Sequence, residues 1–222
     1  MSLALLTMRF RLVKAPRSLA FALAALLSYL ALVVPVARAT TVRPPEFSEL
    51  VSGSDYIVRG VVTKVTSDFA APGSKKIITK VEIEVTEVIA GTPPTPLVLT
   101  MLGGRVGDVA MVVQGAPQFV VGDEDVLFVR GNGKQFYPLT AVMHGRYPVL
   151  KDKTTGRAYV ARSNLVPLED TAEVALPMTD GAAATMQQRL KSSTRALSPE
   201  QFAVQIKGVA QAKTATTREN LK

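Results

Sequence analysis

Residues that could carry chemistry are few in this chain and far apart. The 222 residues include one histidine and no cysteine, which excludes a disulfide framework, a thiolate metal site and a cysteine nucleophile. His144 stands in the string Met-His-Gly-Arg with no acidic residue close by. A histidine that acts as a general base or metal ligand needs an orienting partner or co-ligands. We therefore predict no catalytic residue, no metal and no cofactor, and a structural or solvent-facing role for His144.

Three other features could support a site. Asp123-Glu124-Asp125 offers oxygen ligands to calcium, but three adjacent acids lack the spacing of a calcium loop, so we expect a solvated turn before an apolar strand. The glycine-rich string at residues 103–108 lacks the Lys-Ser/Thr ending of a phosphate loop, and its glycines favour a turn or a close strand approach. Thr40 could become an N-terminal nucleophile after processing, but a signal peptidase site explains that terminus more simply.

Residues 1–39 are typical of an export signal. Four basic residues come first, Ser18–Val34 is apolar, Pro35 ends the helical pattern, and Ala37-Arg38-Ala39 has the small residues of a cleavage site. We predict cleavage between Ala39 and Thr40 and an exported protein, periplasmic or extracellular. Translation from Met8 instead of Met1 stays open.

An uncleaved membrane anchor is the alternative for this leader. Residues 18–37 carry no charge, and about 20 such residues span a bilayer. We expect membrane contact only through a leader that is not removed.

Most of the net charge also belongs to the leader. The whole chain carries +8 at pH 7, and residues 1–39 hold five basic residues and no acid, which leaves +3 on the remainder. In that remainder, acids and bases are interspersed, as on an ordinary soluble surface. A nucleic-acid partner is therefore not expected.

Residues 40–166 have the pattern of a β domain. Short β-branched runs separated by Gly- and Pro-containing turns follow a short helix predicted over residues 44–51. Gly60 interrupts the first run and indicates a bulge or sharp coil. Val81, Ile83 and Val85 alternate with charged residues, which places one face in the core and the other in water. About six to eight such runs predict a mainly β fold, an antiparallel small barrel or sandwich.

The C-terminal part has a different composition. Residues 167–197 hold few large apolar residues in no sustained period, and we predict a flexible linker. Residues 198–213 begin with a capping box and place Phe202 and Ile206 on one face, which predicts an amphipathic helix. We expect that helix to make a tethered, exchangeable contact with the domain or a partner, and residues 214–222 to fray.

Several strings between residues 45 and 150 resemble those of known proteins. They are F-x-x-L at 47–50, S-D-x-I-V-x-G-x-V at 54–62, G-G-x-x-G at 103–107, G-A-P-x-F at 115–119, G-D-E at 122–124 and L-F at 127–128. They resemble a group of secreted bacterial proteins for which no activity is established.

More distantly, the string at 54–62 after a short helix resembles the netrin-like module of tissue inhibitors of metalloproteinases. That resemblance implies an OB-type barrel of five strands. The inhibitors act through an N-terminal cysteine that binds zinc, and this chain has no cysteine. Only the fold carries over.

An OB-like face could bind a ligand by stacking on aromatic side chains. The aromatic residues available, most of them expected in the core, are Tyr56, Phe119, Phe128, Phe136, Tyr137, Tyr147 and Tyr159. Our candidates for a ligand-binding face are Arg105, His144 and Tyr147. The sequence predicts an exported, non-catalytic binding module for a protein, peptide or glycan. An extracytoplasmic hydrolase and an accessory or inhibitor-like partner of a secreted protease are the alternatives.

Overall fold

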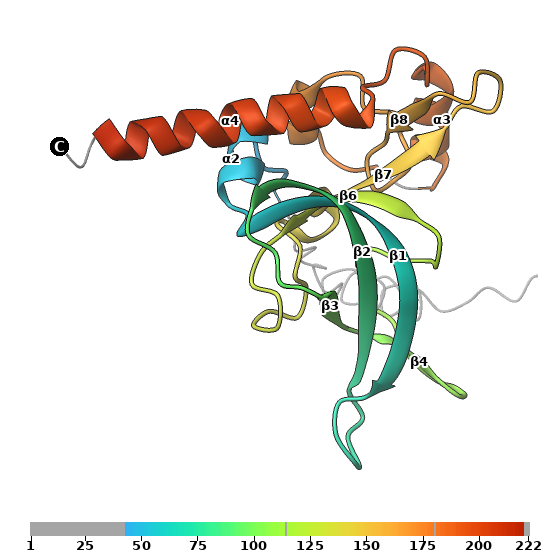
Figure 1. Cartoon of the computed structure of the whole chain (residues 1–222). Helices are drawn as coiled ribbons and strands as arrows, with labels where there is room; N and C mark the ends of the chain where they lie inside the picture. Colours follow the sequence, from blue (N-terminus) through green and yellow to red (C-terminus); the bar gives the residue numbers. More distant parts are fainter. Residues whose placement is uncertain (1–42, 114, 180, 220–222) are drawn as a thin grey trace, which may run out of the picture. The chain divides into compact units, whose positions relative to one another are not determined.

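An antiparallel sheet of six strands, in the order β3-β2-β1-β6-β7-β8, organises the protein (Figure 1). The computed structural model describes residues 43–113, 115–179 and 181–219, with side chains as far as Lys213. The predicted export signal and its cleavage site at Ala39 and Thr40 lie outside these residues. In the part that is described, no helix is long and apolar enough to cross a membrane.

The helices and strands of the protein differ greatly in length. The strands of the large sheet are β1 (Tyr56–Phe69), β2 (Ile77–Gly91), β3 (Leu97–Leu102), β6 (Glu124–Val129), β7 (Arg146–Lys151) and β8 (Ala158–Val160). A second sheet is the two-stranded ribbon of β4 (Gly104–Val106) and β5 (Val109–Met111). The helices are α2 (Phe47–Ser52), η1 (Val142–Gly145), η2 (Thr171–Ala175), α3 (Gly181–Leu190) and α4 (Pro199–Glu219), of which η1 and η2 are 3-10 helices.

The predicted mainly β, antiparallel class is therefore confirmed. Strands β3 and β8 form the two edges of the large sheet, and among the described residues they do not pair with each other, so this sheet does not close into a barrel.

Strands β1 and β2 form a long hairpin that coils strongly. The ladder between them shifts register at three places, beside Ile57, Arg59 and Val62, and each bulge adds local twist. At Gly60 an added Cβ would lie 2.6 Å from Ile83 Cγ2 and 2.7 Å from the Glu84 carbonyl oxygen. The two strands approach too closely there for any side chain, which confirms the bulge predicted at this glycine.

The sheet has a hydrophobic core on each side. On one side, Phe128 and Tyr147 pack edge to face with ring centroids 5.4 Å apart, and helices α2 and α4 cover them. On the other side, Val81 and Ile83 are buried together with residues of β3. The predicted alternation in β2 is thus confirmed, although Val85 is only half-buried, and Glu82 and Glu84 stay out of the core.

Helix α4 corrects the expectation of an exchangeable contact. Its predicted capping box is present, because Gln201 N–H donates to Ser198 Oγ and Ser198 N–H donates to Gln201 Oε1. Phe202 and Ile206 are fully buried, and the ring centroids of Phe202 and Tyr147 are 5.0 Å apart. The helix is part of the core, since its removal would expose the aromatic cluster to water.

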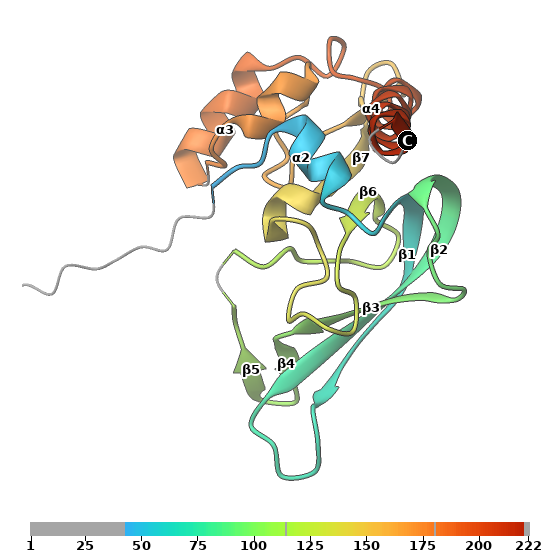
Figure 2. The same ribbon diagram turned by 90° about the vertical axis from the view of Figure 1, so that its left-hand side faces the viewer.

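The predicted flexible linker also contains helices and core residues. Helices η2 and α3 lie within residues 167–197, next to α2 in Figure 2. Leu168, Val174 and Ala196 are buried. Backbone hydrogen bonds from Leu197 N–H to the Leu168 carbonyl and from Val160 N–H to the Leu197 carbonyl tie this segment to β8. Single buried anchors spaced far apart give no periodic pattern, which is why the sequence did not predict them.

Candidate binding cleft

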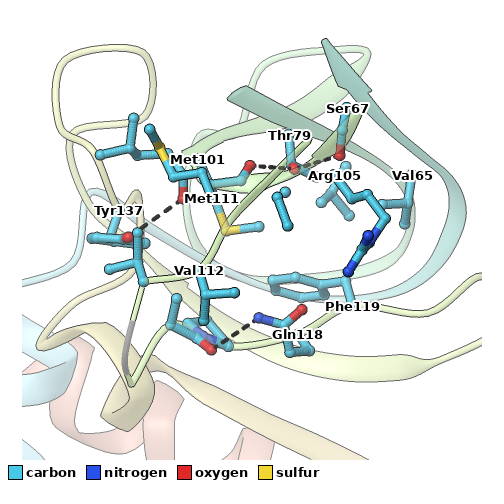
Figure 3. Close-up of a pocket in the computed structure, with 18 residues that line it drawn as sticks. Val65, Ser67, Thr79, Met101, Arg105, Met111, Val112, Gln118, Phe119 and Tyr137 are labelled. Atoms are coloured by element: carbon cyan, nitrogen blue, oxygen red, sulfur yellow. Dashed lines mark hydrogen bonds between the residues drawn. The ribbon is translucent and has the colours of Figure 1, made fainter. Parts of the chain in front are cut away.

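A cleft of about 520 Å³ lies between the distal half of the β1–β2–β3 sheet and the β4–β5 ribbon (Figure 3). Residues 112–113 and 116–119, which follow the ribbon, and Tyr137 line the rest of the cleft. The lining is mostly apolar and includes Val81, Met101, Met111, Val112 and Phe119. Ligand sites commonly have this kind of mostly apolar, concave lining and a volume of about 300–1,000 Å³.

Two glycines allow the ribbon to cross the sheet at this point. Gly103 and Gly104 have φ angles of +103° and +132°, which residues with a side chain rarely adopt. A Cβ on Gly104 would lie 2.3 Å from Thr79 Oγ1 and 2.5 Å from Ser67 Oγ. The ribbon thus passes close to β1 and β2 at these glycines, which confirms the turn or close strand approach predicted from them.

Most hydroxyl groups of the cleft are already hydrogen-bonded to the protein. Thr79 Oγ1 donates to the Gly103 carbonyl at 2.6 Å and accepts from Ser67 Oγ at 2.8 Å. The Tyr137 hydroxyl donates to the Leu102 carbonyl at 3.3 Å. These groups fix the walls and have little capacity left for a ligand.

Arg105 is the charged residue of the cleft. Among the described lining residues there is no acid, and the Arg105 side chain forms no ion pair or hydrogen bond with the described part of the chain. Figure 3 shows it reaching from β4 toward Phe119, beside Val65 and Ser67. The cleft therefore combines an apolar lining with one cation that has no partner among the described residues.

Phe119, at one end of the cleft, rests on a buried ion-pair network. The Arg146 guanidinium lies 4.6 Å from the centre of the Phe119 ring. Arg146 also donates to Asp125 Oδ1 and Asp123 Oδ2, each at 2.8 Å, and to the Gln118 carbonyl. The network joins the cleft wall to β6 and β7 and so fixes the position of the ring.

This network corrects the prediction of a solvated acidic turn. Asp125 has no exposed surface, and its Oδ2 has no hydrogen-bond partner among the described residues. Glu124 pairs with Arg59 at 2.6 Å. Burial raises the pKa of the Asp125 carboxyl above its ordinary value, while Arg146 acts in the opposite direction. The acids attract basic residues from β1 and β7, which lie far away in the sequence.

Of the three residues predicted for a ligand-binding face, Arg105 alone lines the cleft. Tyr147 is buried in the aromatic cluster beside α4, and burial raises the pKa of its hydroxyl. His144 is also buried, at 3% exposure, and its Nδ1 has no hydrogen-bond partner in the described part of the chain. Burial, with a smaller contribution from Arg162, lowers the pKa of His144 to about 4. Tyr147 and His144 therefore belong to the interior.

Sequence reasoning named two further residues of the cleft and missed others. Phe119 and Tyr137 were among the aromatic residues considered for stacking, and both line it. Met101 and Met111 gave no signal, because methionine is common in cores. The cleft arises where segments distant in sequence cross, and such crossings leave no local pattern.

The described residues contain no group of three or more His, Cys, Asp or Glu side chains that could hold a metal ion. No protein-family model matches the chain, and no curated protein matches it. The geometry of the cleft therefore carries the functional assignment.

Proposed function

We propose that the protein is an exported, non-catalytic binding module that holds a segment of another protein or peptide in the cleft. The observation that carries the proposal is the cleft itself, an apolar hollow of about 520 Å³ with the guanidinium of Arg105, which has no partner in the part of the chain that is described. The export part of the proposal rests on the charged, apolar and small-residue regions of residues 1–39.

A protein or peptide ligand fits this lining better than a glycan. Sugar hydroxyls need many hydrogen-bond partners, and unpaired polar groups of a ligand are costly to bury. In the cleft, the hydroxyls of Ser67, Thr79 and Tyr137 are bonded within the protein. Met101 and Met111 add flexible, polarizable surface, which suits apolar side chains of varied shape.

The hydrolase alternative would need a general base beside a nucleophile. The histidine on which that alternative depends lies buried, with its Nδ1 unpartnered within the described residues, so we favour binding over catalysis. The OB-like class and the resemblance to netrin-like modules stay predictions, and the binding proposal does not depend on them.

Site-specific photo-crosslinking tests the proposal. A photo-reactive phenylalanine analogue replaces Val112, which lies at the cleft and is 86% exposed, or Val204, which lies on the outer face of α4 and is 68% exposed. After irradiation of exporting cells, the analogue at position 112 should form a discrete adduct with another protein, and the analogue at position 204 should not. Equal labelling from both positions, or none from position 112, would overturn the proposal.

N-terminal sequencing tests the export part separately. The exported form should begin at Thr40. A chain that begins before Ser18 and stays in the membrane fraction would contradict it.

A further inference from the structure

Strand β1 has a free edge beside the cleft. Strand β6 pairs with β1 from Tyr56 to Val61, and Val62 bonds to the backbone of Gly122 and Asp123. Beyond Val62, β1 continues to Phe69 with β2 on one side. In the described part of the chain, no strand pairs with its other side.

The hydrogen-bond pattern shows which groups point outward at this edge. Val62 bonds on the β6 side, and the register shift next to it makes Thr63 an extra residue in the ladder. Across the hairpin, Ala70 N–H donates to the Lys76 carbonyl. Because pairs alternate along an antiparallel ladder, Lys64, Thr66 and Asp68 bond to β2. The backbone N–H and C=O groups of Val65 and Ser67 therefore point away from β2, toward the free edge.

The contact between Ser67 and Thr79 agrees with this assignment. Their hydroxyl oxygens are 2.8 Å apart across the β1–β2 ladder. Side chains come closest at the pairs that do not exchange backbone hydrogen bonds. Val65 and Ser67 thus combine outward backbone groups with side chains that line the cleft.

The opposite edge of the same three strands is closed. On β3, the Asn132 side chain accepts from Thr100 N–H and donates to the Val98 carbonyl, and Leu102 N–H donates to the Phe136 carbonyl. An unpaired strand edge is a template for another chain, and at this cleft the template is on β1.

We propose that the β1 edge and the cleft together bind an extended peptide of a partner protein by β-strand addition. The inference rests on the proposed binding function and names its ligand class. The peptide's backbone bonds to Val65 and Ser67, and its alternate side chains enter the cleft, as in other complexes in which a peptide adds a strand to a sheet. Those side chains are apolar, except for an acidic one that pairs with Arg105.

The structure also limits the length of the peptide. At the far end of the edge, the Phe69 N–H bonds to the Asp68 carboxylate at 2.7 Å, so the peptide cannot use it. At the near end, the backbone N–H and C=O groups of Val62 are already hydrogen-bonded to Asp123 and Gly122. About five peptide residues fit between these two ends, since a strand advances about 3.4 Å per residue.

Selection from a random eight-residue peptide library displayed on phage, with the exported protein as bait, provides the probe. Selected peptides should share apolar residues at alternate positions and an acidic residue among them. Each amide of one synthetic peptide is then N-methylated in turn, and affinity is measured by fluorescence anisotropy. Methylation should weaken binding at least about 10-fold at every second position and little between, because only alternate amides bond to the edge.

A charge exchange tests the role of Arg105. Arg105→Glu should lower the affinity for the acidic peptide by about 10-fold. A peptide with Lys in place of its acidic residue should bind the Arg105→Glu variant with the affinity restored. Lys75→Glu, at an exposed position in the turn between β1 and β2, changes the charge equally and should alter affinity less than about 3-fold. Circular dichroism confirms that both variants fold.

Failure of this inference is distinct from failure of the binding function. Crosslinking at position 112 combined with peptides that show no two-residue period would overturn strand addition and leave the binding module intact. Failure to recover any peptide, or an Arg105→Glu variant with unchanged preference, would also overturn it. A dimer in sedimentation equilibrium that Val65→Pro dissociates would show that a second copy occupies the edge, and the inference would be wrong.

Discussion

Replacing Arg146 by leucine should destabilise the protein strongly, because it leaves a buried carboxylate without its partner. Asp125 has no exposed surface and accepts from Arg146 through Oδ1, while its Oδ2 is already unpartnered among the described residues. Breaking a buried ion pair in this way costs about 3–5 kcal/mol. The stacking of Arg146 on Phe119 adds about 1 kcal/mol. Asp123 is more exposed and contributes little.

Urea unfolding followed by circular dichroism measures this loss. At pH 7 the free energy of unfolding of Arg146→Leu should fall by about 4–6 kcal/mol, from the broken ion pair and the lost stacking together. Burial raises the pKa of Asp125 and Arg146 lowers it, so in Arg146→Leu this carboxyl takes up a proton at a higher pH than in the unsubstituted protein, and protonation removes its unpaired charge. The loss of stability in Arg146→Leu should therefore shrink as the pH is lowered.

The matched control for this experiment is the double variant Asp125→Asn with Arg146→Leu. This double variant has no ionisable group at position 125, so no buried charge is left without a partner. It should therefore be more stable than Arg146→Leu alone at pH 7. A loss below about 1 kcal/mol in the single variant, as for a surface residue, would show that Asp125 is not buried in solution. The ion-pair network that holds Phe119 in place would then be wrong.

Three further predictions concern the core, the buried histidine and the crossing of the two sheets. Phe202→Ala should lower the free energy of unfolding by about 3–5 kcal/mol in urea, against at most about 0.5 kcal/mol for Val204→Ala on the exposed face; similar losses would mean that α4 is not docked. Because the pKa of His144 is lowered to about 4, its contribution to stability is present above pH 6.5 and is lost as pH falls toward 4. His144→Gln should therefore reduce the fall of the melting temperature over this pH range, and an unchanged pH dependence would contradict the burial of His144. Gly104→Ala should weaken peptide binding by at least about 10-fold because its Cβ would clash with the sheet, whereas Gly107→Ala, with open space around it, should change affinity little.

Local patterns in the sequence predicted part of the fold correctly. The two-residue period of β2, the bulge at Gly60 and the cap at the start of α4 all depend on residues close together in the chain. Steric and hydrogen-bonding rules act directly on such residues. These features therefore needed no knowledge of the tertiary structure.

The remaining features depend on contacts between distant segments. Phe202 is buried because Phe128 and Tyr147 form a surface for it, and its own helix does not encode that surface. Asp125 is buried because Arg146, 21 residues away, reaches it. An acid in a turn is ordinarily solvated, so the sequence favoured the wrong environment for it.

The candidate site was the least predictable part. Arg105, one of the residues predicted for a ligand-binding face, lines the cleft, but the cleft exists only because Gly104 lets the ribbon cross over Ser67 and Thr79. His144 and Tyr147 were chosen for their chemistry, which says nothing of burial. Tertiary packing placed both in the interior.

Amide hydrogen exchange, with and without a selected peptide, tests the central claim that the cleft and the β1 edge form the binding surface. In the free protein, the amides of Val65 and Ser67 should exchange fast and those of Lys64 and Thr66 slowly, because the latter bond to β2. Bound peptide should slow Val65 and Ser67 by at least about 10-fold and leave Lys64 and Thr66 unchanged. Slowing confined to residues outside the cleft, with Val65 and Ser67 unaffected, would contradict the account.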